Sequence, residues 1–130
     1  MIVVDAGVLA TALGDDGTQG DRGRARLRGE VLTAPELVDL EVASVFRGLQ
    51  AAGKLDARRA ELAVAALADF PLRRAPHRPL LARCWQLRAN LTCYDAAYVA
   101  LAEAFGTTLV TTDRRIARST GVRCEVEILA

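Results

Sequence analysis

The chain has 130 residues, 52% of them hydrophobic, and a formal net charge of +1 at pH 7, so we expect one domain, residues 1–130, with one core. Its three cysteines lack the spacing of zinc ligands, and their odd number argues against a disulfide framework, so we expect them in the core of a protein of the reducing cytoplasm. No apolar run is long enough to cross a membrane, so we expect a soluble protein. Lys54 is the only lysine among 17 basic residues. This arginine bias keeps nucleic acid open as a partner but is equally compatible with a biased genomic base composition.

The N-terminal part alternates short strands with helices. Residues 2–5 form a β-branched run closed by an aspartate, and residues 8–13 follow as a helix that this aspartate would cap. Residues 19–28 are polar and arginine-rich, which indicates a surface segment with helical character. Residues 31–34 predict a second strand, and Pro35 suits the first turn of the next helix.

The clearest helix is predicted over residues 36–52, where apolar side chains recur at helical spacing: Val38, Val42, Val45 and Leu49. Glu41 lies at the flank of this stripe, so its carboxylate is directed at the edge of the core. Leu40 lies on the opposite, otherwise polar side. Its position indicates a second buried face and hence a dimer.

A further helix is predicted from Asp56, its N-cap, through Asp69, with packing through Leu62, Val64 and Leu67. Residues 70–75 indicate an edge strand or a connector because Pro71 cannot donate to a ladder. A helix follows over residues 79–88. This region has no acid between Asp69 and Asp95 but five arginines, which makes it the best candidate for a phosphate-contacting surface: Arg73, Arg74, Arg78, Arg83 and Arg88.

The last third of the chain predicts a second clear helix over residues 94–105, which Gly106 would cap at its C-terminus. The apolar stripe of this helix is Tyr94, Tyr98, Leu101 and Phe105. A strand over residues 107–111, a short helix from Asp113 to Arg118 and an edge strand over residues 122–129 complete the chain. This order of elements predicts an α/β protein with three layers, α/β/α, around a central parallel sheet.

Four carboxylates occupy positions that a parallel sheet could bring together. Asp5 and Asp113 close strands, Asp95 starts a helix and Glu41 borders an apolar stripe. Ligands of open parallel sheets bind at the carboxyl ends of the strands. Carboxylates crowded there would raise one another's pKa, so the cluster is tolerable mainly when a divalent cation neutralises it. Mg²⁺ and Mn²⁺ fit, because both prefer oxygen ligands.

Each of these positions also has a purely structural explanation. Asp5, Asp95 and Asp113 are placed as helix N-caps would be, and Glu41 could be a helix-flank charge. Thr111 could hold a metal-binding carboxylate or a water, or could be an ordinary strand threonine. The coincidence of all four acids at one sheet edge is what favours a site.

Other kinds of site find little support. The chain has no G-x-S-x-G motif, no G-x-G-x-x-G motif and no P-loop, and its only histidine, His77, is expected to be exposed and alone. A phospho-accepting signalling domain would need a lysine near a strand end, whereas Lys54 lies in a helix-terminal turn.

Four fragments carry a family resemblance: Val3-Val4-Asp5-Ala6, Glu41-Val42-Ala43 on a helix after Pro35, the run from Tyr94 to Glu103, and Thr111-Thr112-Asp113-Arg114-Arg115. Together, and in this order, they resemble the PIN-domain ribonucleases. More narrowly, the chain is similar to the VapC toxins of bacterial VapBC toxin–antitoxin pairs.

The resemblance implies Mg²⁺- or Mn²⁺-dependent endonucleolytic cleavage of RNA, with four catalytic residues: Asp5, Glu41, Asp95 and Asp113. Of these, the three aspartates would bind the metal, and Glu41 would be a further ligand or would orient the attacking water. Thr111 and Thr112 would support the ligands, and four arginines would contact RNA: Arg73, Arg74, Arg78 and Arg83.

The resemblance also implies a homodimer and a small VapB-type antitoxin whose tail covers the acidic groove. The chain departs from the family pattern at Gly7, where a small polar residue is common, and after Asp113, where Arg114 and Arg115 replace a further acid found in some members. The alternative function is that of a PIN-like binding module with little or no catalysis.

Overall fold

The computed structural model describes residues 1–130 and contains one five-stranded sheet in which every neighbouring pair of strands is parallel. Its strands, in chain order, are β1 (Ile2–Val4), β2 (Leu32–Pro35), β3 (Arg73–Ala75), β4 (Leu109–Thr111) and β5 (Val126–Ile128). Their order across the sheet is β3-β2-β1-β4-β5, so β1 is central and lies beside β4. The carboxyl ends of β1 and β4, which precede Asp5 and Asp113, therefore adjoin.

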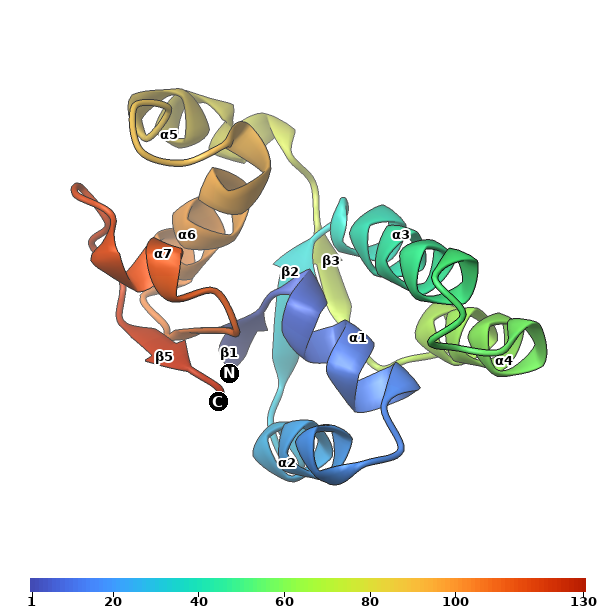
Figure 1. Ribbon diagram of the computed structural model, residues 1–130. Coiled ribbons are helices and arrows are strands. Elements are labelled where there is room, and N and C mark those ends of the chain that lie inside the picture. The colour runs from blue at the N-terminus through green and yellow to red at the C-terminus, as the bar shows by residue number, and fades with distance from the viewer.

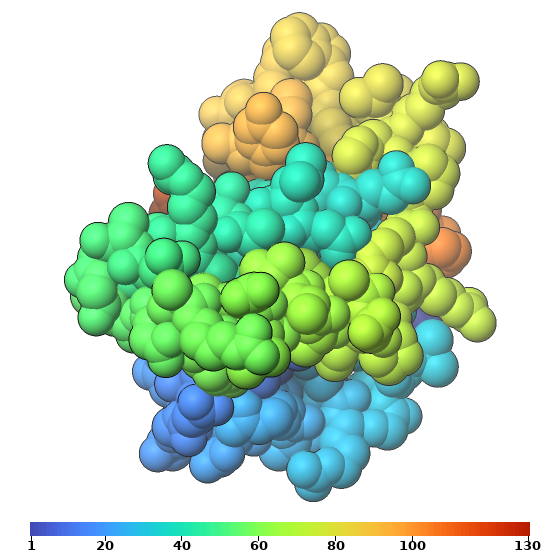
Figure 2. Space-filling model, turned by 90° about the vertical axis from the view of Figure 1, so that its right-hand side faces the viewer, coloured from blue at the N-terminus to red at the C-terminus, as the bar shows by residue number.

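Helices cover both faces of the sheet (Figure 1). They are α1 (Ala6–Gly14), α2 (Thr18–Leu27), α3 (Val38–Ala51), α4 (Ala57–Ala68), the 3₁₀ turn η1 (Arg78–Leu80), α5 (Leu81–Gln86), α6 (Cys93–Phe105) and α7 (Arg114–Arg118). Helices α1, α3 and α4 lie on one side and α5 and α6 on the other. Figure 2 shows α3 and α4 side by side across one face of the molecule, with α2 below them. The predicted three-layer α/β/α architecture is confirmed.

The core is a single cluster of 30 buried residues centred on the middle strands. Val3, Val4, Leu109 and Val110 are completely buried because helices cover both faces of β1 and β4. A strand buried on both faces is held rigidly by its neighbours. The residues that directly follow β1 and β4 are therefore fixed in position.

The helical stripes differ from the predicted ones at particular residues. In α3, Val45 is 39% exposed, whereas Phe46 is 1% exposed and packs its ring against Gly14 of α1. Because α3 contacts both α1 and α4, its buried face is rotated toward these two helices. In α4 the buried residues are Ala60, Ala63 and Leu67, and the predicted Leu62 and Val64 are exposed.

Other differences concern the ends of elements. Pro35 is the last residue of β2 rather than a first-turn helix residue, because α3 begins only at Val38. Tyr94 and Phe105, at the two ends of α6, are exposed although Tyr98 is buried. Of the cysteines, Cys84 is buried, Cys124 is partly buried and Cys93 is exposed, so the expectation of three core cysteines was wrong for Cys93. None of the helices combines the length and apolar character needed to cross a bilayer.

Candidate active site

The four predicted carboxylates line one open cavity of about 590 Å³ at the carboxyl edge of the sheet. Asp5 and Asp113 come from the loops after β1 and β4, Glu41 from α3 and Asp95 from α6. The expectation that a parallel sheet would gather these side chains is therefore confirmed as geometry. From here on this space is called the acidic cavity.

Asp5 is the most deeply buried of the four, with 7% of the residue exposed. It is the N-cap of α1, since its Oδ1 accepts a 2.9 Å hydrogen bond from the Val8 amide, and its Oδ2 accepts one from the Thr111 hydroxyl. Burial raises the pKa of Asp5, and the charges of Asp113 and Asp95 raise it further, whereas these two hydrogen bonds act in the opposite direction. The Asp5 carboxylate is thus capped and also crowded by like charge.

Thr111 connects two of the acids. Its hydroxyl, completely buried at the end of β4, donates to Asp5 and accepts a 3.0 Å hydrogen bond from the Asp113 amide. Thr112 lines the cavity but makes no hydrogen bond to any of the four carboxylates, and instead packs against Gly7. A Cβ on Gly7 would lie 2.6 Å from the Thr112 hydroxyl oxygen. Of the two threonines, only Thr111 supports a carboxylate directly.

Glu41 projects from α3 toward α6, where its Oε1 accepts a 2.6 Å hydrogen bond from the Tyr98 hydroxyl. Burial raises the pKa of Glu41, and the nearby Asp95 and Asp5 charges add to this, while the bond from Tyr98 lowers it. The same pairing, together with burial, raises the pKa of Tyr98, so its hydroxyl stays protonated and donates. Tyr98 was predicted only as part of an apolar stripe, and its hydrogen bond to Glu41 was not predicted. Its spacing of three residues from Asp95 on one helix was the available signal.

Asp113 is the N-cap of α7, and its Oδ1 accepts a 2.9 Å hydrogen bond from the Arg115 amide. The Arg115 guanidinium clamps the same carboxylate, with Nη2 2.6 Å from Oδ2 and Nε 3.0 Å from Oδ1. This pairing holds the pKa of Asp113 below its usual value. The Arg115 side chain is 82% exposed, so the clamp lies at the mouth of the cavity and water competes with it.

Asp95 lies in the first turn of α6 and is not itself the cap. The N-cap is Thr92, whose hydroxyl accepts a 3.1 Å hydrogen bond from the Asp95 amide. This bond is one half of a capping box, and the prediction of Asp95 itself as the N-cap was wrong. The Asp95 carboxylate forms no hydrogen bond or ion pair in the structure, so it is the acid most available to a ligand in the cavity.

The donor set fits a hard divalent cation. Asp5, Asp95, Asp113 and Glu41 supply only oxygen atoms, and Arg115 is the single cation paired with any of them. No three of the chain's acidic, histidine or cysteine side chains converge closely enough to hold a metal ion by themselves. The all-oxygen donor set, rather than a ready-made cage of protein ligands, is what suits Mg²⁺ or Mn²⁺, with water in the remaining coordination positions.

The four arginines predicted to contact RNA fall into two pairs. Arg74 forms a two-bond ion pair with Asp39, 2.7 and 2.9 Å long, and Arg83 forms one with Glu103, 2.7 and 3.1 Å long. These bonds join β3 to α3 and α5 to α6, which gives both arginines a structural role. Arg73 and Arg78 are exposed and form no ion pair.

His77, expected to be exposed and alone, is exposed but not alone. Its Nε2 accepts a 2.9 Å hydrogen bond from the amide of Leu37, which lines the acidic cavity just before α3. Ser44 also lines this cavity but forms no hydrogen bond. Because the histidine faces the backbone and the serine has no base beside it, the cavity contains no Ser–His pair.

Fold and cavity together define a class of protein: an α/β/α protein with four carboxylates lining a cavity at the carboxyl edge of a parallel sheet. Comparisons with known proteins are more specific. The family model of the PIN domain matches residues 2–121. The chain is 39% identical over 129 residues to ribonuclease VapC9 of Mycobacterium tuberculosis, covering 99% of this chain and 98% of that protein. Ribonuclease VapC1 of the same species is 38% identical, with 98% and 96% covered. The chain therefore belongs to the VapC ribonucleases of the PIN-domain family.

Solved structures agree on the fold. The M. tuberculosis toxin VapC20, which cleaves the sarcin–ricin loop, superposes with a TM-score of 0.66 at 18% identity, covering 95% of this chain and 99% of the other. VapBC2 of Rickettsia felis, bound to a DNA fragment from its promoter, gives a TM-score of 0.67 at 15% identity with both chains fully covered. At these identities the likeness concerns the fold alone.

Proposed function

We propose that the chain is a metal-dependent endoribonuclease that acts as the toxin of a toxin–antitoxin pair. The observation that carries this proposal is the convergence of Asp5, Glu41, Asp95 and Asp113 in one open cavity of a VapC-family chain. The names of its relatives support ribonuclease activity. The carboxylate donor set supports the dependence on Mg²⁺ or Mn²⁺.

In this proposal Asp5, Asp95 and Asp113 hold the cation. When bound, Mg²⁺ or Mn²⁺ supplies Lewis-acid activation of water and neutralises charge at the phosphodiester. Thr111 fixes Asp5 relative to the backbone of Asp113 through its two hydrogen bonds. The Asp5 carboxylate is thus fixed in place before its ligand arrives, whereas Asp113 has to exchange its ion pair with Arg115 for the ligand.

Glu41 is the proposed acceptor of a proton from the attacking water. Its raised pKa brings the carboxylate closer to the pH of the cell, which makes it a better base than an exposed glutamate. The Tyr98 hydroxyl holds Oε1, so the other oxygen, Oε2, remains free to face the cavity. We assign Tyr98 a positioning role.

A cleavage assay separates this proposal from a binding module without catalysis. The wild-type chain is incubated with a labelled oligoribonucleotide and Mn²⁺, with excess EDTA as the control. We expect internal cleavage that EDTA abolishes and restored Mn²⁺ recovers. Intact RNA at high protein concentration with Mn²⁺ present would leave only the binding module.

We also propose that a VapB-type antitoxin covers the acidic cavity. Leu40, 76% exposed, together with Val45 and Tyr94 forms an apolar rim beside the four carboxylates. Such a rim suits a partner segment with apolar and basic side chains. Two structural neighbours are toxin–antitoxin complexes, from R. felis and Neisseria gonorrhoeae.

The test is co-purification of the chain with a co-expressed VapB-type antitoxin. Leu40→Asp is expected to weaken that complex, whereas Leu62→Asp, on the exposed surface of α4 outside the cavity, is the matched control. Equal effects of the two substitutions would exclude the rim as the partner's binding site.

The homodimer is a separate proposal, supported by the same exposed leucine and by the family. Light scattering of the purified chain over a range of concentrations measures it directly. We expect twice the monomer mass for the wild type, and a monomer at all accessible concentrations would contradict it.

A further inference from the structure

A second cavity, of about 490 Å³, adjoins the acidic cavity on the side of α1 and α3. The two cavities share three lining residues, Gly7, Val45 and Thr112, so they lie side by side, and together they are called the groove. Asp5 precedes the nine-residue helix α1 and Asp15 follows it, so the groove runs along a helix about 14 Å long. That length exceeds the axial rise of about 3.4 Å per phosphate along one strand of a nucleic-acid helix, so a strand bound at the acidic cavity can extend into the second cavity.

The only lysine of the chain, Lys54, lines this second cavity, which is called the Lys54 cavity below. Its side chain is exposed and takes part in none of the ion pairs of the structure. Its backbone, by contrast, is fixed. The Lys54 amide donates to Leu49 O at 2.8 Å and the Gly53 amide to Gln50 O at 3.0 Å, with Gly53 at a φ of +71°. This is a Schellman motif at the end of α3.

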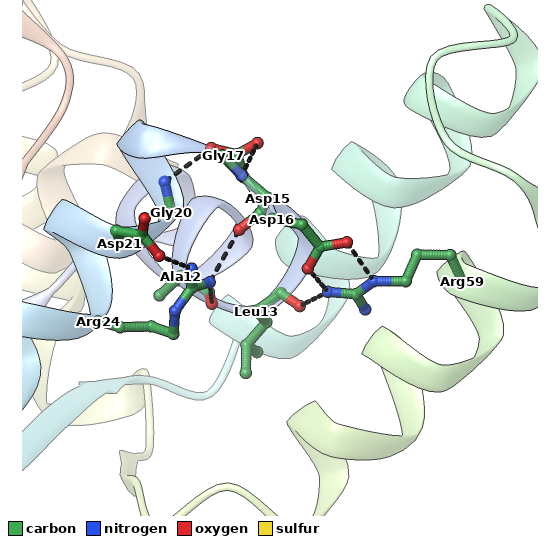
Figure 3. A network of polar contacts seen from close by, with 9 residues as sticks. All are labelled: Ala12, Leu13, Asp15, Asp16, Gly17, Gly20, Asp21, Arg24 and Arg59. Atoms are coloured by element: carbon green, nitrogen blue, oxygen red, sulfur yellow. Dashed lines mark hydrogen bonds and ion pairs between the residues drawn. The ribbon is translucent and has the colours of Figure 1, made fainter.

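The opposite wall of the Lys54 cavity, the turn between α1 and α2, is also fixed (Figure 3). The two carboxylate oxygens of Asp15 accept hydrogen bonds from the amides of Gly17 and Gly20, at 3.3 and 2.7 Å. The Arg24 guanidinium donates to Asp15 O and to Ala12 O, at 2.8 and 2.9 Å. Asp15, the one acidic residue that lines this cavity, therefore has both carboxylate oxygens bonded to the backbone of its own turn.

A second arginine fixes the same turn from α4. Arg59 Nη2 donates to Leu13 O at 2.8 Å and to Asp16 Oδ1 at 3.1 Å (Figure 3). Both walls are thus held by hydrogen bonds within the folded chain. The cavity presents Lys54 as a cation, and Gln19 and Thr11 as neutral hydrogen-bonding groups.

We propose that the Lys54 cavity is a binding subsite for a nucleotide of the substrate RNA next to the scissile bond, an inference that rests on the proposed ribonuclease function. Lys54 pairs with a phosphodiester of the flanking nucleotide, and Gln19 and Thr11 hydrogen-bond to its base or ribose. The four carboxylates repel the backbone of the strand they act on. A cation further along the same groove offsets that repulsion and sets the direction of the strand.

Lys54→Gln removes the charge with little change in length, and its effect is measured as binding of a fluorescent oligoribonucleotide by anisotropy. We expect the dissociation constant to rise about fivefold at low salt. The slope of log K against log salt should fall by about 0.7, the value for one lost phosphate contact on a single strand. In cleavage the same variant should raise KM with kcat unchanged, and Lys54→Arg should restore both measurements.

Arg47→Gln is the matched control, because Arg47 is an exposed, unpaired cation on α3 that lines none of the cavities described here. Equal effects of Lys54→Gln and Arg47→Gln, or no effect of Lys54→Gln, overturn the subsite. If the wild type cleaves RNA and Lys54→Gln weakens only the complex with a protein antitoxin, the Lys54 cavity binds that partner. In that case the RNA subsite is wrong, while the proposed ribonuclease function stands. If the wild type neither binds nor cleaves RNA, the proposed function fails as well.

Discussion

The hydrogen bond between Tyr98 and Glu41 joins α6 to α3 across the acidic cavity and can be tested by removing one atom. Tyr98→Phe keeps the buried ring and deletes the hydroxyl that donates to Glu41 Oε1 at 2.6 Å. A hydrogen bond to a charged group contributes about 1.5–3 kcal/mol. Because Glu41 is only partly buried and water can replace the donor, we expect a loss of about 1–1.5 kcal/mol in the free energy of unfolding.

A double-mutant cycle isolates this bond. Urea unfolding of the metal-free wild type, Tyr98→Phe, Glu41→Gln and the double variant gives the coupling energy between the two side chains, which we expect at about 1 kcal/mol. Tyr94→Phe is the control, because Tyr94 is exposed on the same helix and forms no hydrogen bond. The same Tyr98→Phe variant should lower kcat about tenfold, corresponding to roughly 1.4 kcal/mol, since Glu41 loses its fixed orientation. A coupling energy near zero together with an unchanged kcat would refute the positioning role of Tyr98.

Three further predictions concern the same region. Burial raises the pKa of Asp5, so the wild type loses stability as pH rises from the ordinary aspartate pKa of about 3.9 through the raised one. Metal-free Asp5→Asn should therefore gain in stability relative to the wild type over this rise in pH, and a difference in urea unfolding that stays constant with pH would contradict this. Arg115→Ala frees the Asp113 carboxylate and should tighten Mn²⁺ binding measured by electron paramagnetic resonance, whereas Arg114→Ala should not. Gly20→Ala places a Cβ 1.8 Å from Asp15 O and should cost about 2 kcal/mol or more in thermal unfolding. The control Gly48→Ala lies inside α3, where a Cβ meets no atom, and should instead gain about 0.5–1 kcal/mol from helix propensity.

The fold was largely predictable because its signals are local. Short β-branched runs closed by polar residues predict buried parallel strands, and the alternation with helices fixes a three-layer arrangement. Helix rotation was less predictable. Val45 and Phe46 are both apolar and adjacent, and the sequence does not show that it is the Phe46 ring that packs against Gly14 of the neighbouring helix.

The positions of the four carboxylates also followed from the sequence, because Asp5 and Asp113 come directly after adjacent strands. Their partners did not follow. The bond from Tyr98 to Glu41 spans 57 positions of sequence, and the ion pairs of Arg74 and Arg83 span 35 and 20. Such pairs depend on how two packed helices, or a helix and a strand, are rotated. An arginine-rich segment therefore predicts charge, but not which of its arginines remain free for RNA.

The most direct test of the proposed function compares RNA cleavage by the wild type and by Asp95→Asn in the presence of Mn²⁺. Asp95 is the best position because its carboxylate forms no hydrogen bond or ion pair, so the substitution removes a charge without removing a helix cap. We expect cleavage to fall at least about 100-fold with an unchanged unfolding temperature. Full activity of Asp95→Asn, or inactivity of the wild type, would contradict the assignment of the acidic cavity as a ribonuclease centre.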